Sequence, residues 1–297
     1  MSATAARPGA DPAALAPAVA AALTGIQVGA AMVATRFAVD AVGPGSLALL
    51  RYVIAVLCLA PFVLLARHRT IRRADVLPIA LLGIGQFGVL IALLNYGLQT
   101  VPAARAALLF ATFPLMTMLV AAALGREPLT RAKSTGVALT FLGVAVALGE
   151  KLTATGGGAW IGEAAVLASA LVGGICTALY RPYLARNPAL PVGALAMLAS
   201  VLALALLAAA EGFFSMPPTP DPTQSAAILF IGLSSGVFYV VWLWALGRAS
   251  PTRVAAFLSL SPIAAAILGA ILLDEPVGLA AVAGLAIVVA GLVAAHR

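Results

Sequence analysis

Two stretches decide the fold of this 297-residue chain: RAALLFATFPLMTMLVAAALGREP at residues 105–128 and RVAAFLSLSPIAAAILGAILLDEP at residues 253–276. They lie 148 residues apart, which is half the length of the chain. The shift superposes Pro114 on Pro262, and it also superposes the opening arginines and the closing Glu-Pro pairs. Matches of Ala and Leu arise by chance in apolar sequence, whereas matches of Arg, Pro and Glu-Pro rarely do. The pattern predicts an internal repeat, with one copy in each half.

The composition indicates a protein that is dissolved in lipid. Hydrophobic residues make up 63% of the chain and charged residues only 9%, and the mean hydropathy is +1.11. Soluble domains carry about 25% charged residues, and disordered chains need low hydrophobicity. A bilayer takes about 20 apolar residues per helix. We expect ten such spans, at 14–35, 46–66, 76–97, 103–124, 134–149, 160–181, 190–210, 225–246, 252–272 and 278–295.

The spans predict α-helices, because they lack the alternating segments of a transmembrane β-barrel. The fold class is therefore an all-α polytopic membrane protein. Each half of the chain holds five spans, and an odd number of spans inverts the second copy relative to the first. We divide the chain into a tail at 1–13, a first five-helix repeat at 14–149, a linker at 150–159 and a second five-helix repeat at 160–297. Inverted repeats are typical of secondary transporters.

The distribution of basic residues predicts the topology. The net charge is +7, and most Lys and Arg residues lie between the spans. If the N-terminus is cytoplasmic, all but four of the 17 Lys and Arg residues face the cytoplasm, and the four exceptions are Arg36, Arg51, Arg105 and Lys151. This asymmetry is the positive-inside signal of a membrane protein. It predicts that both termini and the tail are cytoplasmic, that the linker is periplasmic, and that the basic residues do not bind nucleic acid.

Each half also contains a helix with two glycines seven residues apart, at Gly136 and Gly143 and again at Gly284 and Gly291. This helix follows the Pro-containing span and the Glu-Pro turn. A ten-span chain of about 300 residues with this pattern in both halves resembles the drug/metabolite transporter superfamily, in its EamA-like ten-helix branch. Bacterial exporters of amino acids in that branch, including the aromatic amino-acid exporter, have this size and span count.

The resemblance implies two inverted five-helix repeats around a central cavity, with the third and fourth helices of each half lining much of it. It implies the inner membrane of a bacterium as the location. It also implies export of amino acids, aromatic or apolar, or of related small metabolites. Multidrug efflux is an alternative function of such a fold, although bulky cations would favour an accessible carboxylate that the spans do not contain.

Polar or aromatic side chains inside apolar spans are costly in lipid and usually face the interior of the bundle. The residues that we expect in the cavity are Gln27, Gln86, Leu90, Asn95, Tyr96, Ser234, Phe238, Tyr239 and Trp242. Ser234, Phe238 and Trp242 are four residues apart, so they share one face of a helix. An aromatic face with a few hydrogen-bonding groups suits a small amphiphilic solute. An aromatic belt at the membrane interface is the alternative for Trp242.

The two superposed prolines interrupt the fourth and ninth spans. Proline inside a helix removes a backbone donor and clashes with the preceding turn. We expect Pro114 and Pro262 to kink or hinge the helices beside the cavity, and a tolerated packing kink is the alternative. Glycines two turns apart lie on one face and let helices approach closely. Such glycines pack either within one chain or between two copies. The pattern therefore leaves a monomer and a homodimer as alternatives.

No cofactor, metal or enzymatic chemistry is expected from the sequence. Two isolated cysteines, Cys58 and Cys176, provide no metal motif, and no phosphate-binding Gly-x-x-x-x-Gly-Lys loop occurs. Residues 232–236 read GLSSG, which matches the Gly-x-Ser-x-Gly pattern of serine hydrolases. The only histidines are His68, in a basic loop, and His296, at the C-terminus, so a base for Ser234 is lacking. An intramembrane serine hydrolase is the alternative of a different class.

Coupling to protons usually needs a carboxylate or histidine inside the membrane. The acidic residues lie at the ends of the spans or outside them, and only Glu163 enters the start of a helix. The sequence therefore favours facilitated export or exchange, with Glu163 as the one candidate for proton coupling.

Overall fold

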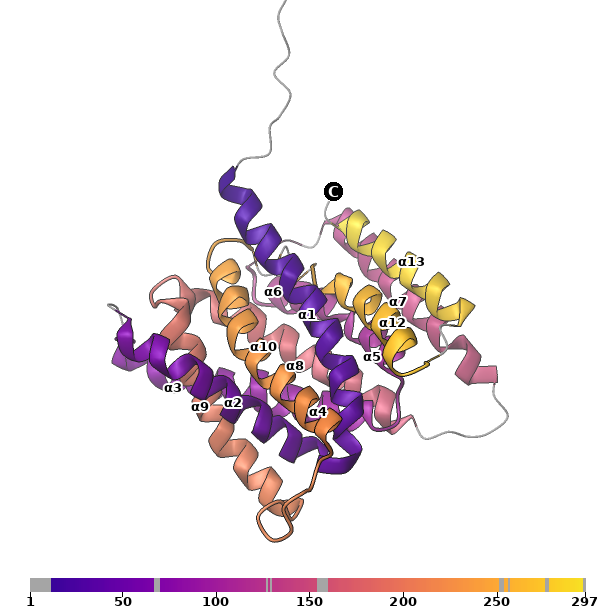
Figure 1. The fold of residues 1–297 in the computed structure, drawn as a ribbon. Coiled ribbons are helices and arrows are strands. Elements are labelled where there is room, and N and C mark those ends of the chain that lie inside the picture. Colours follow the sequence, from indigo (N-terminus) through magenta and orange to yellow (C-terminus); the bar gives the residue numbers. More distant parts are fainter. Residues whose placement is uncertain are drawn as a thin grey trace, which may run out of the picture.

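A computed structural model describes residues 12–66, 70–126, 128, 130–153, 160–250, 254–255, 257–275 and 278–295. Within these residues the regular elements are helices, and no strand occurs (Figure 1). The first half holds α1 (Pro12–Val42), α2 (Pro44–Leu65), α3 (Arg73–Gly83), η1 (Ile84–Val89), α4 (Leu90–Leu98), α5 (Ala103–Phe110), α6 (Phe113–Ala123) and α7 (Arg131–Thr153). The second half holds α8 (Ile161–Leu184), α9 (Ala189–Ala210), α10 (Pro222–Leu246), η2 (Phe257–Leu260), α12 (Ser261–Leu272) and α13 (Leu279–Ala295).

The helices confirm the polytopic all-α fold. Seven helical segments in the described residues are long and apolar enough to cross a membrane: Ala16–Val42, Pro44–Leu65, Arg73–Leu98, Ala103–Ala123, Ile161–Leu184, Ala189–Ala210 and Pro222–Leu246. Three shorter apolar helices complete a set of ten, at Ser134–Val146, Ser261–Leu272 and Leu279–Gly291. Large apolar side chains such as Leu65, Leu206 and Leu279 are more than three-quarters exposed. Lipid is the solvent in which such surfaces are stable.

Successive spans alternate in direction between two ends of the bundle. We name these ends the Arg36 end, where α1 ends and α2 begins, and the Asp75 end, where α2 ends and α3 begins. The second half starts at the Arg36 end, because Gly162 at the start of α8 lies against Gly97 and Val101. Helix α8 therefore runs opposite to α1, and the two halves are inverted repeats.

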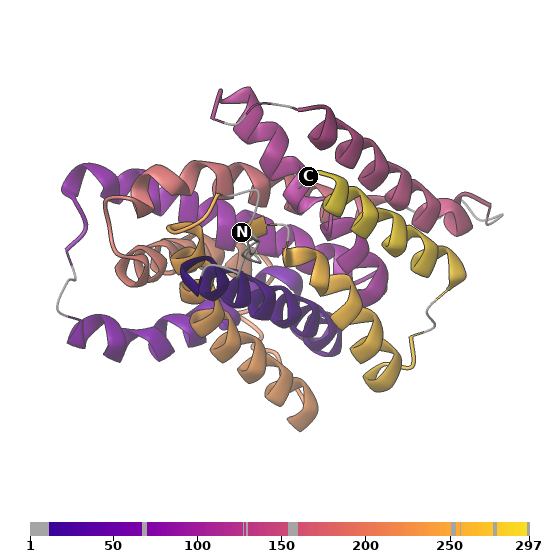
Figure 2. The ribbon, with the colours of Figure 1, turned by 90° about the horizontal axis from the view of Figure 1, so that it is seen from above.

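The last helices of the two halves pack against each other. A Cβ atom added to Gly143 of α7 would lie 2.6 Å from the carbonyl oxygen of Gly284 in α13. A Cβ added to Gly291 would lie 2.8 Å from the carbonyl oxygen of Gly136. These four residues are the glycines that the 148-residue shift superposes, and they allow two helix backbones to approach closely. Figures 1 and 2 show α7 and α13 side by side at the edge of the bundle.

The fourth span of each half is broken just before its proline. Helix α5 ends at Phe110 and α6 begins at Phe113, with Pro114 in its first turn. In the second half the 3₁₀ turn η2 leads into α12, which has Pro262 in its first turn. Proline is favoured in a first turn because the donor it lacks has no partner there. The prolines thus begin new helices, and the breaks lie on the N-terminal side of each.

A π-helical segment, η1, interrupts the third span between α3 and α4. Such insertions are rare and often occur at functional sites, because the extra residue turns side chains out of the regular helical register. Gln86 and Phe87 lie in this segment, and both are buried. Several expected landmarks lie outside the described residues, namely Glu127, Arg253, Pro276, residues 1–11 of the tail and residues 154–159 of the linker.

Candidate functional site

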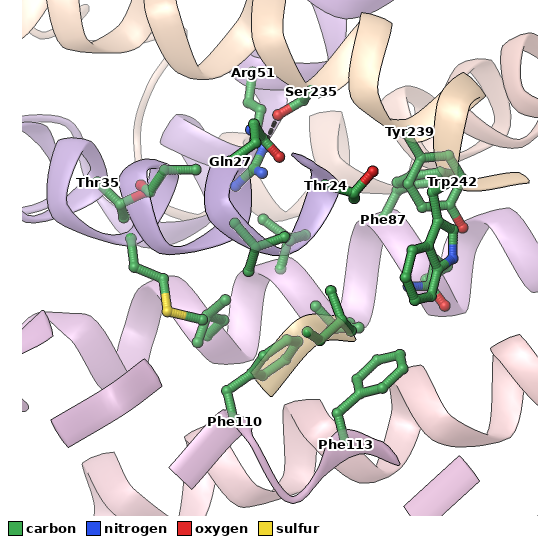
Figure 3. A pocket seen from close by; sticks show the side chains of 18 of the residues that line it. Thr24, Gln27, Thr35, Arg51, Phe87, Phe110, Phe113, Ser235, Tyr239 and Trp242 are labelled. Carbon is green, nitrogen blue, oxygen red and sulfur yellow. Dashed lines mark hydrogen bonds between the residues drawn. The ribbon is translucent and has the colours of Figure 1, made fainter. Parts of the chain in front are cut away.

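A cavity lies between the two halves, and side chains from both halves line it (Figure 3). Its empty space is about 710 Å³ when its opening is included. The first half contributes residues of α1, α2, η1, α4, α5 and α6, and the second half contributes residues of α10 and η2. The third and fourth spans of both halves line the cavity, as the family resemblance implied, but α1 and α2 add a large share.

A polar cluster of Gln27, Arg51 and Ser235 forms one part of the lining (Figure 3). The Nε of Arg51 donates a hydrogen bond of 2.7 Å to the hydroxyl of Ser235, which connects α2 to α10. Gln27 of α1 donates a hydrogen bond of 2.9 Å from its Nε2 to the hydroxyl of Ser234. Both hydrogen bonds join the first half of the chain to the second. The polar cluster is therefore built by both repeats.

Aromatic side chains form another part of the lining. The ring of Phe87 lies 4.2 Å from that of Tyr239, centroid to centroid, and the ring of Phe113 lies 6.4 Å from that of Trp242. Both pairs are edge-to-face, which is one of the arrangements that aromatic rings prefer. Phe110 stands beside Phe113, at 5.3 Å. The side chains of this aromatic wall come from η1, α5, α6 and α10, so it also spans the two halves.

The broken fourth span places both phenylalanines of the wall. Phe110 ends α5 and Phe113 begins α6, and the break between them turns both rings toward the cavity. Leu258 of η2 lines the cavity from the corresponding break in the second half. The breaks before Pro114 and Pro262 thus lie directly beside the cavity.

The face of α10 that lines the cavity carries Ser235, Tyr239 and Trp242. The sequence predicted Ser234, Phe238, Tyr239 and Trp242 for this helix, and of these Tyr239 and Trp242 line the cavity. Ser234 faces α1 instead, where it accepts the hydrogen bond from Gln27. Trp242 is 3% exposed and lies within the bundle rather than at its lipid surface. The sequence spacing predicted how often residues of one face recur along the helix. It did not predict how the helix is rotated about its axis, and therefore which face lines the cavity.

Four of the remaining predicted residues divide evenly between the cavity and its surroundings. Gln86 and Leu90 line the cavity. The Oε1 atom of Gln86 is buried and has no hydrogen-bond partner among the described residues. Asn95 lies outside the lining and donates a hydrogen bond of 3.0 Å to the carbonyl oxygen of Pro44. Tyr96 is 45% exposed on the outer surface of α4.

The sequence did not lead us to place Arg51 in the cavity. It was counted among the four basic residues that do not face the cytoplasm. Arg51 is 8% exposed and lines the cavity. Of the described residues in the lining, it is the one with a charged side chain. A signal was present, because Arg51 lies five residues inside an expected span rather than at its edge. The threonines of α1 that line the cavity, Thr24 and Thr35, were also missed.

An ion pair connects the two halves at the Arg36 end. The Nε of Arg36 lies 3.5 Å from Oε1 of Glu275, and the two side chains are 24% and 12% exposed. Arg36 also donates hydrogen bonds of 2.6 and 3.0 Å to the carbonyl oxygens of Leu98 and Gln99. The other carboxylate oxygen of Glu275 accepts a hydrogen bond of 2.9 Å from the backbone nitrogen of Ala103. These contacts tie the end of α1 to the loops after α4 and α12.

A second ion pair connects the halves at the Asp75 end. Asp75 of α3 accepts a hydrogen bond of 2.9 Å from Arg186 and another of 2.8 Å from Asn187. Arg186 and Asn187 lie between α8 and α9. Asn187 also accepts a hydrogen bond of 3.0 Å from the backbone nitrogen of Arg72. Charged contacts between the halves therefore lie at both ends of the bundle, with the cavity between them.

Two inverted helical repeats around an amphiphilic cavity define a membrane transporter. The chain belongs to the EamA-like transporter family, whose model matches residues 15–149 and 160–295. It is 34% identical over 281 residues to a probable terminal-alkyne amino-acid exporter of Streptantibioticus cattleyicolor, covering 93% of this chain and 91% of that one. It is 27% identical over 273 residues to an uncharacterized transporter of Archaeoglobus fulgidus, covering 89% and 92% of the two chains.

A solved crystal structure of another protein has a TM-score of 0.69 against this chain. The match covers 95% of this chain and 96% of the solved one at 22% identity. At that identity the similarity shows the fold alone.

Proposed function

We propose that this transporter exports amino acids with apolar or aromatic side chains, or related small metabolites, across a bacterial inner membrane. The observation that carries the proposal is the cavity between the repeats, which combines a polar cluster at Arg51 with an aromatic wall at Phe113 and Trp242. An amino acid presents the same combination of a charged backbone and an apolar side chain. The relative named as a probable amino-acid exporter supports this class of substrate.

The transport mechanism that fits this architecture is alternating access, in which the halves rock around a central site. The Arg36 end then faces the periplasm and the Asp75 end faces the cytoplasm, with both termini cytoplasmic. Opening either end requires separation of the charged contacts there. We expect facilitated export or exchange, with no enzymatic step.

Multidrug efflux is disfavoured by the charge of the cavity. Bulky cationic drugs are best bound by a carboxylate, and the described residues that line the cavity include no Asp or Glu. Their single charge is the positive charge of Arg51, which repels a cation in a medium of low dielectric constant. An anionic or zwitterionic solute is the better match.

Counterflow in proteoliposomes tests the proposal. Vesicles that contain the purified protein are preloaded with unlabelled phenylalanine, methionine or threonine, and labelled amino acid is added outside. We expect transient accumulation of label that unlabelled amino acid competes and that protein-free vesicles lack. Flux of a cationic dye without flux of any amino acid, from protein that is folded and inserted, would contradict the proposal and favour drug efflux.

A further inference from the structure

We propose that Arg51 binds the carboxylate of the transported solute, so that the cavity selects carboxylates over neutral or cationic analogues of the same size. This inference rests on the proposed function for the identity of the solute, but the choice of a carboxylate comes from the cavity itself. The site is Arg51 of α2, held by Ser235 of α10, and no feature of the sequence alone had assigned it a ligand.

Arg51 carries a positive charge inside a membrane span. Arg51 is 8% exposed and lies eight residues into α2, with apolar residues on both sides of it in the sequence. A charged side chain inside a membrane span is costly and generally faces the bundle interior, where a partner offsets its desolvation. Figure 3 shows the side chain of Arg51 among the residues that line the cavity, with its hydrogen bond to Ser235.

The described part of the chain offers Arg51 no carboxylate partner. Its contacts are the hydrogen bond to Ser235 and the face of the Tyr52 ring, 5.7 Å from the guanidinium carbon to the ring centroid. Asp75 and Glu275 form ion pairs at the two ends of the bundle. Burial of an unpaired charge is strongly destabilising. The Ser235 hydroxyl and the Tyr52 ring offset only part of the free-energy cost of burying this charge. A bound anion would offset the rest.

The geometry of the guanidinium group suits a carboxylate ligand. Arginine presents five N–H donors in a planar fork, and its Nη1 and Nη2 atoms together match the two oxygens of a carboxylate. In this structure Nε is the atom that donates to Ser235, at 2.7 Å. Among the described residues, none accepts a hydrogen bond from Nη1 or Nη2 of Arg51. The hydrogen bond to Ser235 thus fixes the plane of the group and leaves its outer edge available to a ligand.

Another carboxylate contacts the same helix, α2, at a different place. At the start of α2, the carboxylate of Glu211 accepts hydrogen bonds of 2.7 Å from the backbone nitrogens of Gly45 and Ser46. That carboxylate contacts the helix N-terminus and leaves Arg51, further along α2, with no acidic partner. The aromatic wall of the same cavity, which includes Phe113 and Trp242, supplies the apolar surface for the rest of a ligand.

The test measures how strongly four analogues compete with labelled phenylalanine in counterflow. The analogues are phenylalanine, 3-phenylpropanoate, phenylalaninamide and phenethylamine; the first two carry a carboxylate and the last two do not. We expect the two carboxylates to compete about 10- to 100-fold better than the amide and the amine, which is the range of one to two charge-assisted hydrogen bonds. Equal competition by phenylalanine and phenylalaninamide would overturn the inference while leaving amino-acid export in place.

Single substitutions test whether Arg51 is the source of the preference for carboxylates. Arg51→Gln should abolish the discrimination between acid and amide, whereas Arg51→Lys should keep its sign and weaken the binding of both carboxylates. Ser235→Ala should reduce the preference for carboxylates severalfold, because the guanidinium group loses the hydrogen bond that fixes its orientation. Arg36→Gln, which removes a charge outside the cavity lining, is the matched control and should leave the acid-to-amide ratio unchanged. A ratio that is equally large in wild type and Arg51→Gln contradicts the inference.

Direct binding separates this inference from the proposed function. Isothermal titration calorimetry of the purified full chain with 3-phenylpropanoate needs no flux and no amino group. Binding that Arg51→Gln abolishes, in a protein that transports no amino acid, would support the carboxylate site and refute amino-acid export. Absence of binding of phenylalanine and 3-phenylpropanoate to folded wild-type protein would refute the carboxylate site. The wild-type series decides the question even if Arg51→Gln does not fold.

Discussion

Replacing Glu275 with Gln should open the Arg36 end of the transporter. Glu275 pairs with Arg36 at 3.5 Å and accepts a hydrogen bond of 2.9 Å from the backbone nitrogen of Ala103. Glutamine keeps an acceptor for Ala103 but loses the charge. A partly exposed ion pair contributes up to about 1 kcal/mol, and the loss of charge in the hydrogen bond adds a similar amount. The change therefore favours the open end by about 1 to 2 kcal/mol, or about 5- to 30-fold in the ratio of states.

The accessibility of Thr35 measures this shift. Thr35 lies in the cavity lining, one residue before Arg36, and is 2% exposed in this structure. A cysteine is placed there in a chain whose Cys58 and Cys176 are alanine. A membrane-impermeant thiol reagent is then added on the side that the Arg36 end faces. The labelling rate should rise about 5- to 30-fold in Glu275→Gln, in proportion to the open state.

The opposite ion pair supplies the control. Asp75→Asn removes the charge that pairs with Arg186 at the Asp75 end. If the two ends open alternately, this variant should lower the labelling of Thr35→Cys or leave it unchanged. An unchanged rate in Glu275→Gln, or an equal rise in both variants at equal melting temperature, would refute the assignment of these contacts to opposite gates.

Three further substitutions test the cavity and the alternatives. Trp242→Ala should reduce phenylalanine counterflow about tenfold through lost aromatic contact, with a smaller effect on melting temperature. The matched control is Trp244→Ala, because the ring of Trp244 stacks on Arg248 at 4.2 Å. Equal loss of flux in both variants would assign Trp242 to packing. Ser234→Ala removes the acceptor of one hydrogen bond, worth about 1 kcal/mol, and should leave flux largely intact; complete loss from a folded protein would revive the hydrolase hypothesis. Glu163→Gln should leave exchange active, and loss of a pH-driven flux in that variant would demonstrate proton coupling.

The architecture was readable from the sequence because it depends on one-dimensional signals. Apolar runs give the spans, since every crossing needs about 20 apolar residues. The repeat gives the inversion, because five crossings are an odd number. The superposed prolines, Pro114 and Pro262, located the breaks in the fourth span of each half, although the structure shows that the prolines begin new helices instead of bending continuous ones.

The cavity was less predictable, because its lining depends on how each helix is rotated about its axis. Ser234 and Ser235 are neighbours in the sequence, yet one contacts Gln27 and the other lines the cavity beside Arg51. Packing between α1 and α10 decides this rotation, and a single sequence does not encode it as a local signal. Arg51 was misplaced for a related reason: counting charges for topology treats every arginine as a loop residue, whereas this one lies inside a span.

A structure of the protein with bound phenylalanine tests the central claim most directly. We predict density in the cavity, with the carboxylate at the outer edge of the Arg51 guanidinium and the ring against Phe113 or Trp242. The same cavity should be empty of that density in Arg51→Gln at the same concentration. Phenylalanine bound outside this cavity, or an empty cavity in a preparation that is active in counterflow, would contradict the account.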